Sequence, residues 1–168
     1  MGSHIENIRL SFRPDRIRVL FVGESPPANG TFFYKCDSNL CHYTQEAFSS
    51  TFDMEFLDAA HFLKFFGDQG CYLDDLSLTS VNIMDKPTRR RARENGVRLL
   101  ANRIRTYEPE TVIVVMRAIA RYVKESIGIA GLNLVPVYSL PFPSMGNQRK
   151  YVVKLTEVLR ELRAQGNF

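Results

Sequence analysis

The chain has 168 residues, of which 45% are hydrophobic, with a net charge of +4 and a sequence pI of about 9.1. This length is enough for one domain over residues 1–168 and too short for two of ordinary size. The charge favours an anionic partner, and no apolar run is long enough for a membrane span or has signal-peptide flanks. We therefore expect a cytoplasmic protein with no membrane partner; Met1 to His4 resemble an expression-tag remnant.

The expected elements alternate between strands and helices. In chain order they are a strand over residues 17–22, helices over 44–52 and 53–66, a strand within 70–76, a helix from Lys86-Pro87-Thr88 to Tyr107, a strand over 111–116, a helix over 119–127, a strand over 134–138 and a helix over 148–163. Residues 5–12 have no firm apolar period. The alternation predicts an α/β protein with a three-layer α/β/α fold, in which helices cover both faces of a central four-stranded parallel sheet.

The long helix is notable for its arginines. Thr88 is a candidate N-cap, and the buried stripe is expected to include Val97, Leu100 and Ile104. The outer face is expected to carry seven arginines, namely Arg89, Arg90, Arg91, Arg93, Arg98, Arg103 and Arg105. Such a face can bind phosphates, but a solvated helix face is the commoner explanation.

The three cysteines are an odd number, which is typical of reduced thiols rather than of a disulfide framework. Cys36, Cys41 and His42, with Cys71 or His61, could in principle bind zinc, but their spacing is not one of the usual ligand patterns. Free thiols are the favoured interpretation, and we expect no metal site.

Two loops follow predicted strands, one early and one late in the chain. The first is Gly23-Glu24-Ser25-Pro26-Pro27, and the second contains Phe142-Pro143-Ser144-Met145-Gly146-Asn147 and leads into a basic helix. Parallel strands end at the same edge of a sheet, where ligands bind in open α/β folds. The two loops are therefore expected to face each other across one crevice.

In these two loops the chain resembles the uracil-DNA glycosylase superfamily, whose first motif has the form G-Q-D-P-Y or G-E-A-P-G and whose second has the form H-P-S-P-x-N. The order and spacing of the strands between the motifs also agree. The resemblance implies a DNA partner, excision of a flipped base, no cofactor and a monomer. Some relatives hold an iron-sulfur cluster on four cysteines, which this chain cannot supply.

The resemblance also implies a base-binding site. It would consist of Gly23, Pro26, Phe32, Phe33, Asp75 and Phe142. An aromatic ring downstream of the first motif stacks on the base in the family, and Phe32 or Phe33 is its counterpart here. Covering the edge of the core is an equally good interpretation of these rings. Aligned by its flanking residues, the asparagine that reads the base in the family is replaced by Asp75.

The second motif implies the DNA contacts. The family uses this turn and the following helix N-terminus to hold phosphates and drives an apolar side chain into the base stack. The matching residues are Pro143, Ser144, Met145, Asn147, Arg149 and Lys150, with Met145 as the inserted side chain.

The catalytic positions depart from the family pattern. Ser25 replaces the aspartate that positions water, and Phe142 replaces the histidine that stabilises the departing base. The remaining carboxylates at strand ends are Glu24 and Asp75, so we assign catalysis to Glu24, Ser25 and Asp75 and to none of the three histidines. The alternative is that Glu24 caps a turn and Asp75 caps a loop.

The choice of base depends on Asp75 and Pro27. An ionised aspartate only accepts hydrogen bonds, which suits an exocyclic amine, whereas asparagine can also donate to the O4 of uracil. Pro27 is smaller than the tyrosine that blocks C5 substituents in strict uracil enzymes. A 5-modified cytosine is therefore the expected substrate, in repair or in defence against modified foreign DNA. A uracil-excising enzyme and a catalytically silent DNA-binding protein are the alternatives; a nucleotide hydrolase would lack any P-loop or dinucleotide motif.

Overall fold

The computed structural model describes residues 2–168; Met1, the first residue of the tag-like segment, lies outside them. Its elements are α1 (Gly2–Ser11), β1 (Val19–Gly23), α2 (Asn39–Phe52), α3 (Ala59–Asp68), β2 (Cys71–Asp75), α4 (Lys86–Tyr107), β3 (Thr111–Val114), α5 (Ala120–Ala130), β4 (Val137–Ser139) and α6 (Gln148–Ala164). Short 3-10 turns, η1 and η2, lie at Phe33–Lys35 and Arg117–Ile119.

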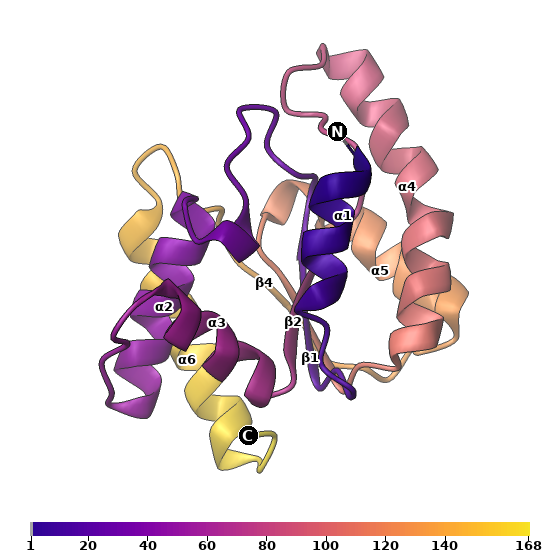
Figure 1. The fold of residues 1–168 in the computed structure, drawn as a ribbon. Coiled ribbons are helices and arrows are strands. Elements are labelled where there is room, and N and C mark those ends of the chain that lie inside the picture. The colour runs from indigo at the N-terminus through magenta and orange to yellow at the C-terminus, as the bar shows by residue number, and fades with distance from the viewer. Residues whose placement is uncertain (1) are drawn as a thin grey trace.

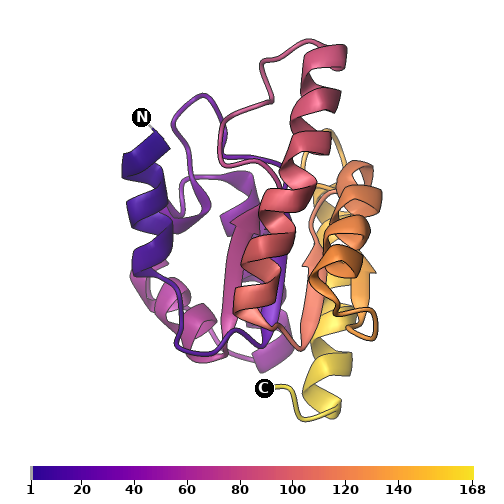
Figure 2. The ribbon, with the colours of Figure 1, turned by 90° about the vertical axis from the view of Figure 1, so that its right-hand side faces the viewer.

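The four strands form one parallel sheet in the order β2-β1-β3-β4. Helices α2, α3 and α6 cover one face, and α4 and α5 pack side by side on the other, which confirms the three-layer α/β/α fold (Figure 1). The register pairs Gly23 with Asp75, and Val114 with Ser139. The carboxyl ends of all four strands therefore meet at one edge, and the turned view shows the long loops at this end and the C-terminus at the other (Figure 2).

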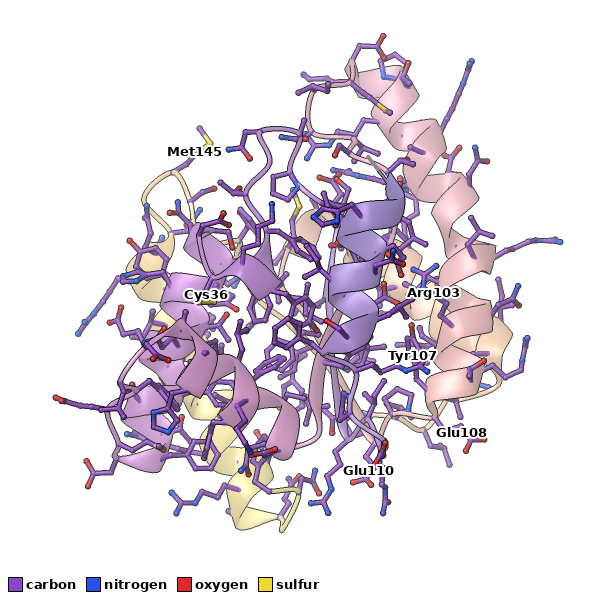
Figure 3. All side chains as sticks on the ribbon, viewed as in Figure 1. Cys36, Arg103, Tyr107, Glu108, Glu110 and Met145 are labelled. Carbon is purple, nitrogen blue, oxygen red and sulfur yellow. A yellow bond between two sulfur atoms is a disulfide. The ribbon has the colours of Figure 1, made fainter. Side chains whose placement is uncertain are left out.

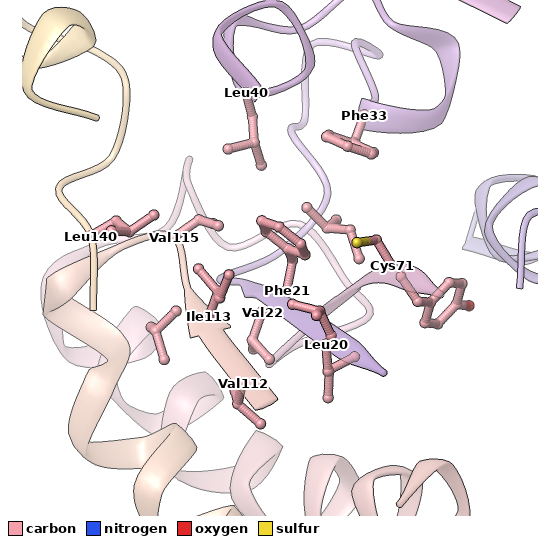
Figure 4. Packing of buried hydrophobic residues seen from close by; sticks show 14 of the residues in the cluster. Leu20, Phe21, Val22, Phe33, Leu40, Cys71, Val112, Ile113, Val115 and Leu140 are labelled. Atoms are coloured by element: carbon pink, nitrogen blue, oxygen red, sulfur yellow. The ribbon is translucent and has the colours of Figure 1, made fainter. Parts of the chain in front are cut away.

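The core lies on both faces of the central strands. Every residue of β1 and β3 is buried, which explains their continuous β-branched and aromatic sequences. Phe21 from β1 packs against Phe48 and Phe66, and Ile113 of β3, its register partner, lies on the same face, whereas Val112 lies on the other face (Figure 4). Burying one such phenylalanine contributes about 2 kcal/mol. The core thus fixes β1, whose end carries the first loop, and its neighbour β3.

Helix α1 is an element that the sequence did not predict. Its inner side carries Ile5 and Ile8, which pack against the core, but also Arg9, which is fully buried. A charged side chain at a buried position interrupts the apolar period from which helices are recognised. The segment therefore reads as irregular although it forms a ten-residue helix beside β2 (Figure 1).

Two helices, α2 and α3, begin at other residues than the apolar period predicted, because capping side chains determine where they start. Ser38 accepts a hydrogen bond from the amide of Cys41, so α2 begins at Asn39 rather than at Thr44. The expected helix over 53–66 is wrong in its first part, because Asp53 adopts a left-handed conformation with φ of 52° that ends α2. Helix α3 then starts after Asp58, whose carboxylate caps it.

Helix α4 has the expected bounds but a different cap. Asp85 rather than Thr88 is the N-cap, and its carboxylate accepts a hydrogen bond from the amide of Thr88 at 2.7 Å. Asp85 precedes the first helical residue, which is where a side chain can reach the free amides of the first turn.

The cysteines differ from the expectation of free thiols. Cys36 and Cys41 form a disulfide with their α-carbons 5.1 Å apart; Cys36 is labelled in Figure 3. The left-handed backbone of Cys36, with φ of 53°, reverses the chain after η1 and brings the two residues together. Cys71 is free, and burial raises the pKa of its thiol well above the ordinary value.

Residues 2–168 contain neither a helix suited to crossing a membrane nor a cluster of metal-binding side chains. None of their helices is long and apolar enough to cross a membrane. Within the same part of the chain, no group of three or more His, Cys, Asp or Glu side chains is arranged to hold a metal ion.

Candidate functional site

A cavity of about 540 Å³ opens at the carboxyl ends of the strands. This volume lies in the range of sites that hold small molecules. Its walls come from four stretches of chain, at residues 23–33, 37–40, 73–82 and 142–145, with Arg89 and Met116 beside them. The first and second loops therefore do face each other across one cavity.

The register between β1 and β2 places Gly23 beside Asp75 at the base of the cavity. A Cβ atom added to Gly23 would overlap Oδ1 of Asp75. Only glycine leaves that space free, so the first residue of the motif lets the carboxylate lie against the backbone of the neighbouring strand.

Asp75 is only 4% exposed, and its two carboxylate oxygens have different surroundings. Oδ2 accepts a hydrogen bond from Arg9 at 2.7 Å. Within residues 2–168, no donor lies in hydrogen-bonding position to Oδ1. Burial raises the pKa of Asp75, and the charge of Arg9 opposes this effect without cancelling it. The side chain is therefore a buried carboxylate with one oxygen available at the cavity.

Arg9 reaches this carboxylate from α1. Its guanidinium bonds Asp74 through Nη1 and Asp75 through Nη2, each at 2.7 Å, and lies over the ring of Phe32 at 5.5 Å from the centroid. Burial alone would lower the pKa of Arg9, but the charges of Asp75, Asp74 and Glu6 outweigh it and raise the pKa. Arg9 therefore remains a cation that is fully enclosed by the protein.

Asp74 connects this pair to α4. Its Oδ2 accepts hydrogen bonds from Arg103 Nε at 2.7 Å and from the Tyr107 hydroxyl at 3.1 Å. Arg103 and Tyr107 lie on the side of α4 that faces β2 and α1 (Figure 3). The carboxylate that enters the cavity is thus the end of a buried polar network that spans three elements.

Glu24 is bound by two arginines from α4. Arg89 and Arg93 donate to its carboxylate, with Nε to Oε1 distances of 2.8 Å and 2.6 Å. Burial alone would raise the pKa of Glu24, but these hydrogen bonds and charges lower it. Glu24 therefore caps no turn with its side chain, and Asp75 caps no loop, so the capping alternative is wrong for both.

The arginines of α4 do not all lie on its outer face. Arg89, Arg93 and Arg103 turn towards the strand ends and pair with Glu24 or Asp74, whereas Arg90 pairs with Glu94 on the solvent side. The expectation of one solvated arginine face is therefore wrong for these three. Their direction depends on carboxylates that lie more than 25 residues away in sequence.

The rest of the first loop is tied to the loop after β2. The hydroxyl of Ser25 accepts a hydrogen bond from the amide of Val81 at 3.1 Å, and Asn82 accepts one from the amide of Ala28 at 3.2 Å. Pro26 is buried and lines the cavity. Ser25 therefore has a structural contact that its sequence position did not indicate.

The aromatic residues after the first loop are mostly enclosed. Phe32 is 1% exposed and Phe33 is 3% exposed, and Phe33 packs edge-on against Tyr34. Figure 4 shows Phe33 near Leu40 above the core. These rings cover the edge of the core and also line the cavity. Phe142 of the second loop is more exposed than Phe32 and Phe33, at 36%.

The second loop projects from the opposite wall. Pro143 is buried, whereas Met145 is 96% exposed at a turn with φ of 50° (Figure 3). Ser144 and Met145 line the cavity. Asn147 precedes α6, and its side chain caps no amide of the helix. The first turn of α6 carries Arg149 and Lys150, both exposed.

Several residues of the cavity wall and its support were not predicted from the sequence. They include Arg9, Asp37, Asn82, Arg89 and Met116. Asp37 and Asn82 lie in polar loops, so their composition gave no signal, and Arg9 lies in the segment that read as irregular. His42 and His61 are not among the residues that line the cavity.

A family model described as the uracil DNA glycosylase superfamily matches residues 10–163. Because this match covers nearly the whole chain, the chain belongs to the uracil-DNA glycosylase superfamily. Members of the superfamily generally hydrolyse N-glycosyl bonds in DNA, and some are inactive. No individual curated protein matches the chain. Arg9 lies just before the matched residues.

Proposed function

We propose that the protein is a DNA glycosylase that takes one altered base into the cavity and hydrolyses the bond between that base and its sugar. Membership of the superfamily supports the reaction class, and a cavity of about 540 Å³ at the carboxyl edge of the sheet supports the site. In this reaction water adds to C1′, the C1′–N bond breaks, and the base leaves with the proton that water releases.

Asp75 is the catalytic carboxylate in this proposal. Both oxygens of Glu24 accept hydrogen bonds from arginines, which leaves it little capacity to orient water or to stabilise positive charge on the sugar. Asp75 keeps Oδ1 without a donor among residues 2–168. We accordingly assign Glu24 and Ser25 to holding the loop in shape and Asp75 to contact with the nucleotide.

The proposed substrate is a base with an exocyclic amine, and in particular a 5-modified cytosine. The observation that carries this choice is the Asp75 carboxylate at the base of the cavity, with Oδ2 held by Arg9 and Oδ1 free to accept. A carboxylate accepts from N4 of cytosine and repels O4 of uracil. Pro27, half-buried in the cavity wall, leaves space for a C5 substituent in place of the family's tyrosine.

The proposed DNA contacts are those of the second loop. Met145 is exposed and projects beyond the cavity wall, which suits an apolar side chain that fills the gap left by a flipped base. Pro143 and Ser144 shape the turn, and Asn147, Arg149 and Lys150 lie at the N-terminus of α6, where phosphates are bound favourably.

The test compares excision of single altered bases by the native protein and by Asp75→Asn. Matched oligonucleotides would carry uracil, hypoxanthine, or cytosine with a hydroxymethyl or bulkier C5 group. The native protein is expected to prefer the modified cytosines. In Asp75→Asn every kcat/KM value should fall, because the catalytic carboxylate is lost. The ratio of the residual kcat/KM values should move towards uracil by about tenfold or more, because one base-reading pair contributes about 1–3 kcal/mol.

Asp37→Asn is the matched control, since it makes the same chemical change on another carboxylate of the cavity wall, one that accepts a hydrogen bond from the amide of Phe32. It should leave the order of preference intact. A native preference for uracil, or the same order in Asp75→Asn, would contradict the assignment of Asp75.

A glycosylase-like DNA-binding protein without catalysis is the second candidate. The occupied carboxylate of Glu24 and the phenylalanine at position 142 favour it, since neither offers a free acid or base. Salt-dependent DNA binding without excision of any base in the panel would support this candidate and reject the enzyme.

A further inference from the structure

We propose that Arg9 is a positioning residue that holds Asp75 as an ionised acceptor at the cavity, and that it thereby sets which base edge the site accepts. The inference rests on the proposed function, because it concerns the group assigned to read the base. It assigns a role to α1, whose residues up to Arg9 precede the part of the chain that the family model matches.

The first support is the geometry of the two hydrogen bonds that the Arg9 guanidinium donates. The guanidinium bonds Asp74 through one terminal nitrogen and Asp75 through the other, each at 2.7 Å. Two hydrogen bonds from one planar group fix the direction of both carboxylates. With Oδ2 of Asp75 held in this way, Oδ1 is the oxygen directed towards the backbone of Gly23 and the cavity.

The second support is the free-energy cost of burying the charge of Arg9. Arg9 is fully buried, and within residues 2–168 its Nε atom makes no hydrogen bond and has only an ion pair with Glu6 at 3.4 Å. A buried ion pair of this kind contributes little to stability compared with apolar side chains of the same volume. The packing of α1 does not require a cation at this position. A role in holding Asp75 would explain why Arg9 is buried there.

The chemistry of the carboxyl group links Arg9 to base choice. An ionised Asp75 accepts from an amine and repels a carbonyl oxygen. A protonated Asp75 has a donor on one oxygen and an acceptor on the other, so it resembles the family's asparagine and suits uracil. Burial favours the protonated form, and the positive charge of Arg9 favours the ionised form. Removing Arg9 should therefore convert an amine-reading site into a carbonyl-reading site near neutral pH.

Besides Arg9, two charged groups act directly on Asp75, namely Asp74 on β2 and Arg103 on α4. The other titratable groups nearby bond other members of the site: Glu6 on α1 pairs with Arg9, Tyr107 on α4 bonds Asp74, and Arg89 and Arg93 hold Glu24 at the neighbouring strand end. Asp74 opposes ionisation of Asp75, whereas Arg103 assists it from the backbone side of the residue. Arg9 differs from all of them because it donates directly to the carboxylate.

The direct test follows the ionisation of Asp75 by carbon NMR of its carboxyl group in the whole protein. In Arg9→Met the pH at which Asp75 titrates should rise by about one to three units, which is the usual effect of an adjacent opposite charge. Arg9→Lys keeps the charge and should titrate close to the native protein. Arg103→Gln is the matched control, since it removes a cation from the same network that does not bond the carboxylate, and its effect should be smaller.

The second readout is base preference against pH. In Arg9→Met the ratio of kcat/KM for modified cytosine over uracil should fall at least tenfold at pH 7 and recover as the pH rises through the new titration. The native protein and Arg9→Lys should show no such recovery. If Arg9→Met does not fold, the double variant Arg9→Met with Asp74→Asn leaves a single buried carboxylate without its partner. Asp75 should then titrate above the native protein but below the value expected for Arg9→Met alone, because the opposing charge of Asp74 is also removed.

The outcomes separate this inference from the proposed function. An Asp75 that titrates at the native pH in Arg9→Met overturns the assignment of Arg9. A base preference that is equally altered in Arg9→Lys and Arg9→Met also overturns it, because a merely structural role would not distinguish the two. A raised titration in a protein that excises no base keeps the assignment of Arg9 and rejects the glycosylase.

Discussion

At the scale of single residues, the site depends on buried charges that are paired across the fold. Glu24 directly follows β1 and Asp75 ends the neighbouring strand β2, and each carboxylate is held by arginine from a helix. The two differ in what remains free, since the oxygens of Glu24 are occupied while Asp75 keeps one. The two carboxylates lie at the carboxyl ends of neighbouring strands, but we expect different roles for them.

Glu24→Gln should destabilise the protein by about 2 kcal/mol at pH 7, because hydrogen bonds to charged groups contribute about that much. Arg89 and Arg93 are partly exposed, with side-chain exposures of 28% and 18%, and can regain water, so the larger cost of a fully buried pair is not expected. The measurement is the free energy of unfolding in urea.

The same variant gives a pH signature. The pKa of folded Glu24 is lowered from its ordinary value of 4.5, so its contribution is complete above that pH and is lost as the pH falls through the folded pKa. The native protein and Glu24→Gln should therefore converge in stability on acidification. Glu94→Gln, which breaks an exposed pair with Arg90, is the control and should change little. A constant difference between native and variant as the pH falls from neutral to well below 4.5 would contradict the pairing.

At the scale of elements, the disulfide encloses a part of the cavity wall. Cys36 and Cys41 are five positions apart, and all four residues between them, at positions 37–40, line the cavity. Within this loop Asp37 bonds the amide of Phe32 at 2.6 Å, and Ser38 caps α2. The disulfide therefore holds in place the segment that connects the first loop to α2.

Opening this disulfide should lower the free energy of unfolding by about 2 kcal/mol, the value that chain entropy gives for a loop of this size. A dithiol reductant would reduce the bond to two thiols while it forms its own disulfide. Unfolding in urea with and without the reductant measures the effect, and base excision should weaken in parallel because the wall becomes more mobile.

The double variant Cys36→Ser with Cys41→Ser should match the reduced protein and should not respond to the reductant. If the reductant acts equally on this variant, its effect comes from elsewhere, and the assignment to the Cys36–Cys41 bond is wrong.

At the scale of the whole molecule, the parallel sheet gathers the unpaired functional groups at one end. The cavity, Met145 and the start of α6 all lie at the carboxyl ends of the strands (Figures 1 and 3). The opposite end carries a second, more polar hollow lined by residues that include Arg13, Arg16 and Lys64. Basic residues occur at both ends, with Arg149 and Lys150 beside the cavity and Arg13, Arg16 and Lys64 in the opposite hollow, so net charge alone does not identify the DNA-binding side.

Replacing Arg149 and Lys150 by Ala should weaken DNA binding across sequences. The slope of log K against log salt should fall by about one unit for each phosphate that the variant no longer neutralises. The reason is that both side chains are exposed at the N-terminus of α6 beside the second loop. Binding is measured at several salt concentrations on a duplex that contains one altered base.

The matched control replaces Arg13 and Lys64, two basic residues of the opposite hollow, by Ala. It removes the same net charge from the other end of the sheet. A salt slope that falls equally in both double variants, or that is unchanged in the first, would place the DNA elsewhere.

The alternating elements, the parallel sheet and the two facing loops could all be predicted from the sequence. These features depend on local signals, namely apolar periods and the glycine and proline residues that end strands. Because parallel strands end at one edge, loops such as Gly23 to Pro27 and Phe142 to Asn147 had to meet once the order of elements was known.

The pairing of the charges, in contrast, became known only from the folded chain. Arg9 is 66 residues from Asp75 in sequence, and Arg89 is 65 residues from Glu24, so no local pattern could indicate either contact. The same holds for α1, because its buried arginine hides the apolar period of the helix. A charged side chain is buried only where its partner is already in place, and that partner is fixed by the packing of the whole chain.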